Sequence, residues 1–306
     1  MKKLLFILNP HSGKGHVKGR LFGIIDIMVK AGYEVTAYPT QCRDDAQRKV
    51  REEAGNFDLV VCSGGDGTLD EVVTGMMQRQ ERVPIGYIPA GSTNDFANSL
   101  KIPKDMLKAA AVSVQGRRFP VDVGDFNHDS FIYVAAFGLF TAVSYQTSQS
   151  LKNVLGHAAY ILEGAKSLLD IPTYQMRIEH DDQEIEGEFI YGMISNSISV
   201  GGFKNLTGKN VLLDDGVFEV TLIKAPKNPI ELNEIIINLT NRKDNSDLIY
   251  TFKTSELRIY SEGIVPWTLD GEYGGDHRDV VIRNMHQAVE IMVKNPKPAA
   301  KTPENV

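Results

Sequence analysis

Three glycines and a carboxylate follow a short apolar run in the segment VVCSGGDGTLDEVV, residues 60–73. Glycine has no Cβ and permits positive φ, so the backbone amides of Gly64, Gly65 and Gly67 can converge on phosphate oxygens. The helical pattern that follows adds unpaired N–H groups and the positive end of a helix dipole. Asp66 would repel a phosphate unless a cation lies between them, and Mg²⁺ resolves that conflict. The loop therefore predicts a site for a magnesium-bound nucleotide, and a purely structural glycine turn is the alternative.

A second glycine-containing loop is NPHSGKG, residues 9–15. It resembles part of a Walker loop but lacks the complete G-x-x-x-x-G-K-[ST] spacing, which argues against a P-loop NTPase. It could supply backbone amides from Asn9 onward and the ammonium group of Lys14 to a nucleotide. It could equally be a plain loop before a helix, and the spacing alone leaves both interpretations open.

A third loop is PAGSTNDFANSL, residues 89–100. Its glycine turn is followed by Ser92 and Thr93, either of which could serve as a helix N-cap, and a plain cap is the simpler interpretation. Asp95, however, follows a strand end as Asp66 does. This shared position favours a single site that both carboxylates face.

Three further acidic residues are candidates for chemistry. Asp122 interrupts the apolar strand PVDVG, where a carboxylate is costly unless it is paired or bound to a metal. Asp215, in LLDDGVF, lies in a turn that could hold a hard cation, although Asp-Gly is also a common hairpin signal. Glu272, in LDGEYGG, follows a tight turn, and its spacing does not separate a catalytic role from a turn.

The elements that would position these residues begin with alternating strands and helices over the first 120 residues. Strands separated by helices imply parallel pairing and right-handed crossovers, and hence an open α/β sheet. Ligands bind such sheets at the carboxyl ends of the strands, where all three loops lie. We expect this α/β nucleotide-binding domain to span residues 1–123. A last hairpin, residues 280–295, should return to it and add about residues 281–295.

Alternating apolar patterns dominate the rest of the chain and predict a mainly antiparallel β-sandwich over residues 124–280. Helical patterns interrupt it near residues 150–169 and 229–240. We expect the active site in the cleft between the two domains. The tail, residues 296–306, is polar and proline-rich, which predicts disorder.

Composition limits the class of protein. The 306 residues carry a net charge of -6, which argues against nucleic-acid binding. Two cysteines without metal-type spacing argue against disulfides and structural zinc and fit a cytoplasmic protein. No apolar run approaches the roughly 20 residues that a membrane helix needs. Basic residues between 101 and 118 could touch an anionic membrane surface, although a solvated helix face is the simpler interpretation. An edge strand of the sandwich could also pair in a homodimer.

At these motifs the sequence resembles the diacylglycerol kinase catalytic-domain family, specifically the soluble bacterial lipid kinases. The resemblance runs from about residue 3 to residue 295. The motifs appear in family order as NPHSG, GGDGTLDEVV, PAGSTNDFA, VDVG, LLDDGVF and LDGEYGG. GGDGT alone also occurs in NAD kinases and sugar kinases, whereas the ordered set is far more specific.

The resemblance assigns a role to each matching position. It implies that Glu272 is the general base on the lipid hydroxyl, and that Asp66, Asp95 and Asp122 form a carboxylate and water network orienting the catalytic Mg²⁺. It implies that Asp215 binds a second, structural Mg²⁺ with the carbonyls of Leu212 and Val217. The residues expected to line the ATP site are Asn9, Thr40, Gly64, Gly65, Asp66, Gly67, Thr68, Leu69, Asp70, Ser92 and Thr93.

The implied reaction is transfer of the γ-phosphate of ATP to diacylglycerol, which gives phosphatidic acid, at the inner face of the membrane. Other lipid alcohols, such as a sphingoid base or phosphatidylglycerol, remain alternatives, as does an NAD-kinase-like activity. The chain departs from many relatives at two positions. Ser92 replaces a threonine but keeps the hydroxyl, and Asn98 replaces an arginine, which removes a possible phosphate or headgroup contact.

Overall fold

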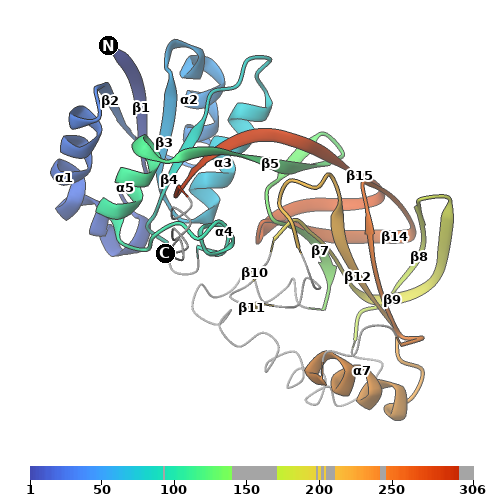
Figure 1. The fold of residues 1–306 in the computed structure, drawn as a ribbon. Helices are drawn as coiled ribbons and strands as arrows, with labels where there is room; N and C mark the ends of the chain where they lie inside the picture. The colour runs from blue at the N-terminus through green and yellow to red at the C-terminus, as the bar shows by residue number, and fades with distance from the viewer. Residues whose placement is uncertain are drawn as a thin grey trace, which may run out of the picture.

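The computed structural model describes residues 1–91, 94–139, 171–197, 199–200, 203–204, 211–241 and 246–295. Ser92, Thr93, the side chain of Lys14, the helix expected near residues 150–169 and the tail lie outside the described residues. The described chain forms two lobes (Figure 1). We call residues 1–116 the α/β lobe and the described residues between 124 and 280 the β-rich lobe.

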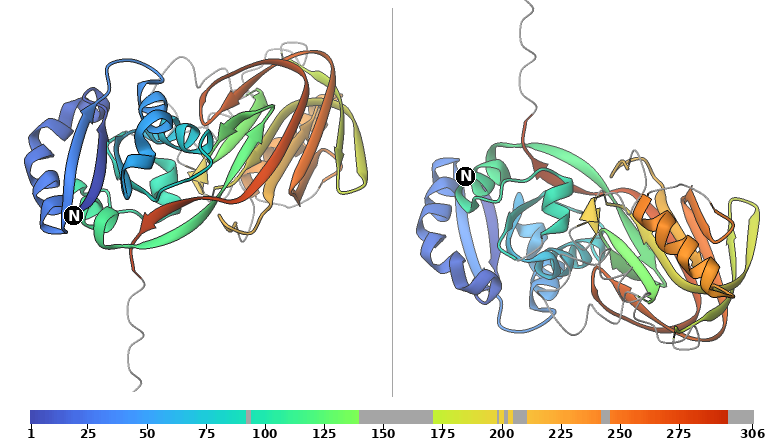
Figure 2. Two further views of the ribbon diagram at one scale, coloured as in Figure 1. Left: turned by 90° about the horizontal axis from the view of Figure 1, so that it is seen from above. Right: turned by 90° about the horizontal axis from the view of Figure 1, so that it is seen from below.

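The α/β lobe contains four parallel strands in the order β2-β1-β3-β4, which are β1 (Lys2–Leu8), β2 (Tyr33–Pro39), β3 (Leu59–Gly64) and β4 (Ile85–Pro89). Its helices are η1 (Ser12–Gly15), α1 (His16–Lys30), α2 (Asp45–Glu53), η2 (Ala54–Asn56), α3 (Asp66–Met77), α4 (Asp95–Ser99) and α5 (Met106–Gln115). The predicted parallel pairing is confirmed. Helices α1 and α5 lie together on one face of these strands, and α2 and α3 lie together on the other (Figure 2).

The β-rich lobe is antiparallel, as predicted. Its strands are β6 (Asp129–Phe131), β7 (Val134–Gly138), β8 (Tyr174–His180), β9 (Gln183–Ser195), β12 (Phe218–Lys224), β13 (Ile249–Thr254) and β14 (Glu256–Leu269). The helix α7 (Pro229–Asn241) confirms the helical pattern expected there, and β10 (Ser199–Val200) pairs with β11 (Phe203–Lys204) in a separate ribbon.

Two long strands connect the lobes (Figure 1). In β15 (Glu272–Val293) the first part pairs with β14, and the last part pairs with β5 (Arg117–Phe126). Ile291 of β15 also pairs with Ile85 of β4, so the hydrogen-bonded sheet runs continuously through both lobes. The hairpin expected at residues 280–295 is therefore wrong. The segment is one strand with a register shift between Met285 and Val289, and the polar residues that resembled a turn form this bulge.

Two apolar clusters stabilise the lobes. In the α/β lobe β3 and β4 are buried along their whole length and β1 is buried from Leu4 onward, whereas the edge strand β2 is partly exposed. In the β-rich lobe Trp267 is the largest fully buried side chain, with edge-to-face ring contacts to Phe126 at 5.0 Å and Phe137 at 4.9 Å. Because Phe126 ends β5, this second cluster anchors the connecting strand in the β-rich lobe.

Candidate functional site

The loops after β1, β3 and β4 meet at the carboxyl edge of the parallel strands. The N–H of Asn9 donates to the carbonyl of Ser63 at 2.9 Å, and the N–H of Ala90 donates to the carbonyl of Gly64 at 2.7 Å. The side-chain amide of Asn9 also lies 3.3 Å from the hydroxyl of Thr68. These contacts bring three of the loops that were singled out from the sequence to one place.

Asp66 and Asp95 lie next to each other in this group. Asp66 is the first residue of α3, and Asp95 is the first residue of α4. The backbone N–H of Asp95 donates to Oδ2 of Asp66 at 3.2 Å, and Asp95 is 2% exposed. Two acidic residues that follow different strand ends are therefore neighbours in the fold.

The structural reason for glycine differs between positions in these loops. A Cβ on Gly91 would lie 2.7 Å from Cα of Gly65, so these two loops can approach only without side chains. A Cβ on Gly67, by contrast, would meet no atom within 4 Å. The internal packing of the described chain gives no reason for glycine at position 67, whereas a ligand that approaches the exposed start of α3 does.

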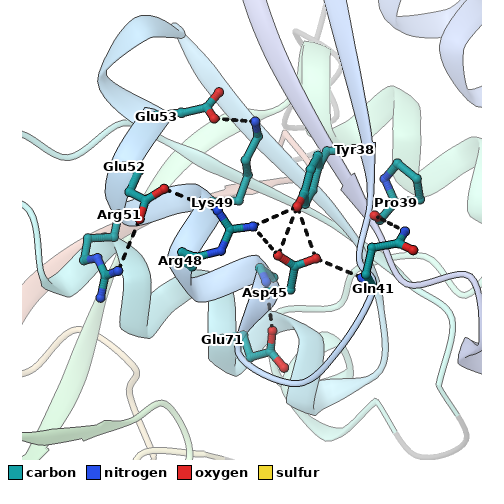
Figure 3. Close-up of polar contacts among 11 residues, drawn as sticks. Tyr38, Pro39, Gln41, Asp45, Arg48, Lys49, Arg51, Glu52, Glu53 and Glu71 are labelled. Atoms are coloured by element: carbon teal, nitrogen blue, oxygen red, sulfur yellow. Dashed lines mark hydrogen bonds and ion pairs between the residues drawn. The ribbon is translucent and has the colours of Figure 1, made fainter.

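Thr40 follows β2, and its N–H donates to the carbonyl of Leu8 at 2.9 Å, which places it beside the loop that begins at Asn9. The segment after Thr40 is held by the buried carboxylate of Asp45 (Figure 3). This carboxylate accepts hydrogen bonds from the N–H of Gln41 at 2.8 Å, from Arg48 at 2.6 Å and from the hydroxyl of Tyr38 at 3.0 Å, the three partners drawn around it.

Burial alone would raise the pKa of the Asp45 carboxyl, but these hydrogen bonds outweigh it and lower the pKa. The carboxylate of Glu71 in α3 then accepts the N–H of Ala46 at 3.0 Å (Figure 3). The start of α2 is thereby attached to α3. The loop with Thr40 has a defined position relative to the Gly64–Thr68 loop.

Glu272 begins β15 and is exposed. It follows a two-residue turn formed by Asp270 and Gly271, which have φ values of 51° and 85°, and Leu269 pairs with Glu272 across that turn. The backbone carbonyl of Asp270 accepts a hydrogen bond from the hydroxyl of Tyr133 at 2.8 Å. This hydrogen bond holds the turn that precedes Glu272.

The carboxylate of Asp270 is buried and holds the strand connection between β6 and β7. Oδ2 accepts the N–H of Ile132 at 2.6 Å, and Oδ1 accepts the N–H groups of Tyr133 and Val134, both at 2.9 Å. Burial raises the pKa of Asp270 to about 6, although these three N–H donors oppose the shift.

Asp70 of α3 lies beside Asp270, although the two residues are 200 positions apart in the sequence. Burial raises the pKa of Asp70, and the negative charge and hydrogen bonding of Asp270 raise it further. Burial also raises the pKa of the Tyr133 hydroxyl, together with the negative charges of Asp270, Asp66, Asp95 and Asp70. Carboxylates from both lobes therefore act on one buried region, and α3 lies against β6 and β15 there.

Asp122 contacts a different set of groups. It is fully buried in β5, where its Oδ2 accepts the N–H of Gly216 at 2.6 Å and its Oδ1 accepts the N–H of Gln287 at 2.7 Å. Nδ1 of His286 lies 3.1 Å from Oδ1. His286 and Gln287 are the bulge residues of β15, so the carboxylate satisfies a backbone donor that the bulge removes from the strand ladder.

Asp215 belongs to the turn that Asp122 holds. Its Oδ2 lies 3.3 Å from the ammonium group of Lys253, and its Oδ1 accepts the N–H of Val217 at 3.3 Å. Lys253 also pairs with the buried carboxylate of Glu219 at 2.8 Å. Leu212, whose carbonyl was expected to bind the same cation, is 56% exposed. A cation at this turn would compete with Lys253 for Asp215.

Comparisons with known proteins identify the family. Residues 3–126 match the model of the diacylglycerol kinase catalytic domain. The chain is 35% identical to the diacylglycerol kinase of Bacillus subtilis over 90% of this chain and 91% of that protein. It is 36% identical to the diacylglycerol kinase of Staphylococcus carnosus over 95% of this chain and 94% of that protein. The chain belongs to the diacylglycerol kinase family. The resemblance seen in the sequence is therefore confirmed, and the family is one of phosphotransferases with an alcohol acceptor.

The fold agrees with solved structures of diacylglycerol kinases. The crystal structure of a diacylglycerol kinase from Bacillus anthracis is 24% identical and superposes with a TM-score of 0.75 over 96% of this chain and 97% of that chain. A second crystal structure from that organism is 25% identical and gives a TM-score of 0.82 over 96% and 98% of the two chains. This chain shares its mixed α/β architecture with extensive antiparallel sheet with both of these structures.

The two cation sites expected for a diacylglycerol kinase differ in how well the described residues suit them. Within the described ranges, no group of three His, Cys, Asp or Glu side chains is arranged to hold a metal. Mg²⁺ is often bound by one or two carboxylates together with phosphate oxygens and water, and the neighbouring residues Asp66 and Asp95 could supply such carboxylates. At Asp215 the fit is poorer, because both carboxylate oxygens already accept hydrogen bonds.

Sequence reasoning did not find some of the residues that organise this member of the diacylglycerol kinase family. Glu71 and Tyr133 act through contacts 25 and 137 positions away in the sequence. Asp45 contacts near neighbours, Tyr38, Gln41 and Arg48, but it lies outside the glycine-rich motifs. Asp270 could have been predicted from the sequence, since it precedes glycine in the same motif as Glu272.

No described helix has the length and apolar character to span a membrane.

Proposed function

We propose that this chain is an ATP-dependent lipid kinase that transfers the γ-phosphate of ATP to the hydroxyl of diacylglycerol, giving phosphatidic acid and ADP. The observation that carries the proposal is that helix α3, which begins in the glycine-rich loop, lies against β6 of the other lobe and against the connecting strand β15. There Asp70 of α3 lies beside Asp270 of the turn before Glu272. This neighbourhood supports a site in which the candidate base of the β-rich lobe acts near the candidate phosphate loop of the α/β lobe. We accordingly propose that the active site lies between the two lobes.

In the proposed step, a carboxylate oxygen of Glu272 accepts the proton of the lipid hydroxyl while that oxygen attacks the γ-phosphorus. The bond between the γ-phosphorus and the β–γ bridging oxygen breaks, and ADP leaves with the electron pair. Catalysis of this kind depends mainly on positioning and on neutralising charge. The rigid base of the turn, held by Tyr133 and Asp270, supplies the positioning of Glu272.

The nucleotide is proposed to bind at the carboxyl edge of the parallel strands, against the exposed start of α3. The N–H groups of Gly65 and Gly67 support phosphate binding because they belong to a glycine-rich helix start. The N–H of Thr68 donates to the carbonyl of Gly65 at 3.1 Å. Asn9 and Thr40 line the same edge, and Ser92 and Thr93 are proposed to complete it. Mg²⁺, bound beside Asp66 and Asp95, would neutralise the phosphate charge.

The identity of the alcohol is the finer part of the proposal. The curated relatives named above are diacylglycerol kinases, which favours diacylglycerol over a sphingoid base or phosphatidylglycerol. The test is a transfer assay with radiolabelled ATP and Mg²⁺ against diacylglycerol, sphingosine, phosphatidylglycerol and NAD. We expect label in phosphatidic acid. Label in NADP, or in none of the lipids, would refute the proposal.

A further inference from the structure

A pocket of about 520 Å³ lies outside the region of Asp66, Asp270 and Glu272. Its walls come from the end of α4, the start of β5, the segment before Asp215 and the end of β15. The lining residues are Ser99, Leu100, Lys101, Arg117, Phe119, Val211, Leu212, Leu213, Asp214, Val293, Lys294 and Asn295. The pocket thus combines apolar walls with cationic side chains, and this combination indicates what kind of ligand it could bind.

Three cationic side chains line this pocket, against a single acidic one. Lys101, Arg117 and Lys294 are all exposed, and Asp214 is the only carboxylate among the described lining residues. Within the part of the chain that the structure describes, none of the three cations forms an ion pair, whereas the neighbouring Arg118 pairs with Glu290 at 3.2 Å. In a protein with a net charge of -6, this is a local excess of positive charge.

The apolar walls adjoin these charges. The guanidinium group of Arg117 lies over the ring of Phe119 at 5.2 Å, which holds the charge against an apolar surface. Leu212 is 56% exposed and is one of the large apolar side chains that the fold leaves in water. A soluble anion would gain nothing from Leu212 or Phe119, whereas an anionic amphiphile would contact both kinds of surface.

The pocket is also held in shape. The N–H of Asp122 donates to the carbonyl of Leu213 at 2.8 Å, which ties one wall to β5. Lys101 has a φ of 55° and follows the end of α4, a position that usually favours glycine. Its N–H donates to the carbonyl of Asn98 at 3.2 Å. A lysine thus occupies a position where the backbone disfavours a side chain, which points to a use for its charge.

We propose that this pocket binds the phosphate headgroup of an anionic phospholipid in the membrane surface, with Lys101, Arg117 and Lys294 on the phosphate and Leu212 against the adjoining acyl region. The choice of a lipid as ligand rests on the proposed function, because a lipid kinase must reach its substrate in a bilayer. The site docks the enzyme and takes no part in phosphoryl transfer.

The test uses the full chain with K101G, R117Q and K294Q combined. Glycine at position 101 suits the positive φ, so this variant should fold. The matched control removes three exposed basic residues that do not line the pocket, with K2Q, K30Q and R51Q. Vesicles of phosphatidylcholine with and without phosphatidylserine are sedimented with each protein, in the absence of ATP and diacylglycerol.

We expect wild type and control to bind the phosphatidylserine vesicles and the pocket variant to partition about 100-fold less, since each basic side chain near an anionic membrane contributes about a factor of five. Equal binding by the pocket variant and wild type would overturn the site. An equal loss in the control would also overturn it, because net charge would then explain binding. If inorganic phosphate at low concentration displaced the protein from the vesicles, free phosphate and not a lipid would be the ligand of this pocket.

Phosphorylation of a short-chain, water-soluble diacylglycerol separates this inference from the proposed function. The pocket variant should phosphorylate the soluble substrate as wild type does. If wild type fails on that substrate while vesicle binding still depends on the three cations, the proposed function fails and the docking site stands. If phosphorylation persists but vesicle binding does not depend on the three cations, the proposed docking site is refuted and the proposed function stands.

Discussion

The backbone N–H of Asp95 donates a hydrogen bond of 3.2 Å to Oδ2 of Asp66, so the first turn of α4 is attached to the first turn of α3. The carboxylate of Asp66 consequently has two separable roles. One is to accept this hydrogen bond, and the other, which we propose, is to hold Mg²⁺ beside the phosphates of ATP.

Substitutions at Asp66 separate these roles. Asp66→Asn keeps an oxygen for the N–H of Asp95 but removes the charge, so we expect an unfolding temperature near that of wild type. Affinity for ATP in the presence of Mg²⁺ should fall in both Asp66→Asn and Asp66→Ala, and turnover should fall by roughly 100-fold or more. Calorimetric titration with and without Mg²⁺ measures the difference. Wild-type Mg²⁺-dependent affinity in Asp66→Asn would contradict the metal role.

Glu272→Gln tests the general base. The change preserves the size of the side chain and removes the proton acceptor, so turnover should fall by about 100- to 10,000-fold. Binding of ATP, measured by titration, should stay unchanged because the phosphate loop lies in the other lobe. Glu262→Gln is the matched control, since Glu262 is an exposed glutamate in β14. Unaltered turnover in Glu272→Gln would remove this residue from the mechanism.

Gly67→Ala tests whether a ligand approaches the start of α3. A Cβ at position 67 meets nothing within 4 Å, and alanine favours helix by about 1 kcal/mol over glycine. We therefore expect a slightly higher unfolding temperature together with a weaker affinity for ATP. Gly19→Ala in α1 has the same open surroundings and should raise stability without changing nucleotide affinity. Equal ATP affinity in both variants would argue against phosphate contact at Gly67.

The pair Asp70 and Asp270 predicts a pH dependence of stability. Burial raises the folded-state pKa of both carboxyls, that of Asp270 to about 6, above the value near 4 expected in the unfolded chain. For Asp270 the folded state therefore binds more protons between about pH 4 and 6, and for Asp70 it does so from about pH 4 to well above the ordinary carboxyl pKa. The stability that the pair contributes is lost as the pH rises through these windows.

Asp70→Asn removes one of the two charges. We expect the variant to unfold a few degrees higher than wild type above pH 7, with the difference shrinking toward pH 4. Thermal melts across this pH range measure it. A variant that is less stable than wild type at every pH would show that the pair does not repel.

The turn at Asp215 predicts a dependence on Mg²⁺ if it binds a structural cation as the family resemblance implies. Chelation should then lower the unfolding temperature of wild type but not that of Asp215→Asn. Lys253→Met removes the competing ammonium group and should enlarge the effect of Mg²⁺. If chelation leaves the melting of all three proteins unchanged, Asp215 acts only as a turn residue.

Local pattern was sufficient to predict the strands, helices and loops of the α/β lobe. Apolar runs and helical spacing each depend on a few neighbouring residues, and the glycine loops fall at strand ends because the backbone must turn there. The β8–β9 hairpin was also predictable, because aspartate tolerates the positive φ that two-residue turns need. Asp181 and Asp182 at its tip have such φ values. The end of β15 was not, because a bulge of polar residues resembles a turn when its partner strand is unknown.

The sequence by itself determined the order of the family motifs, the α/β arrangement of the first lobe and the candidate residues Asp66, Asp95 and Glu272. Only the tertiary structure decided that Asp70 meets Asp270, that Asp122 satisfies the β15 bulge and that Lys253 reaches Asp215. The reason is physical. A buried carboxylate is satisfied by whichever donors the fold brings to it, and those donors come from segments tens to hundreds of residues away.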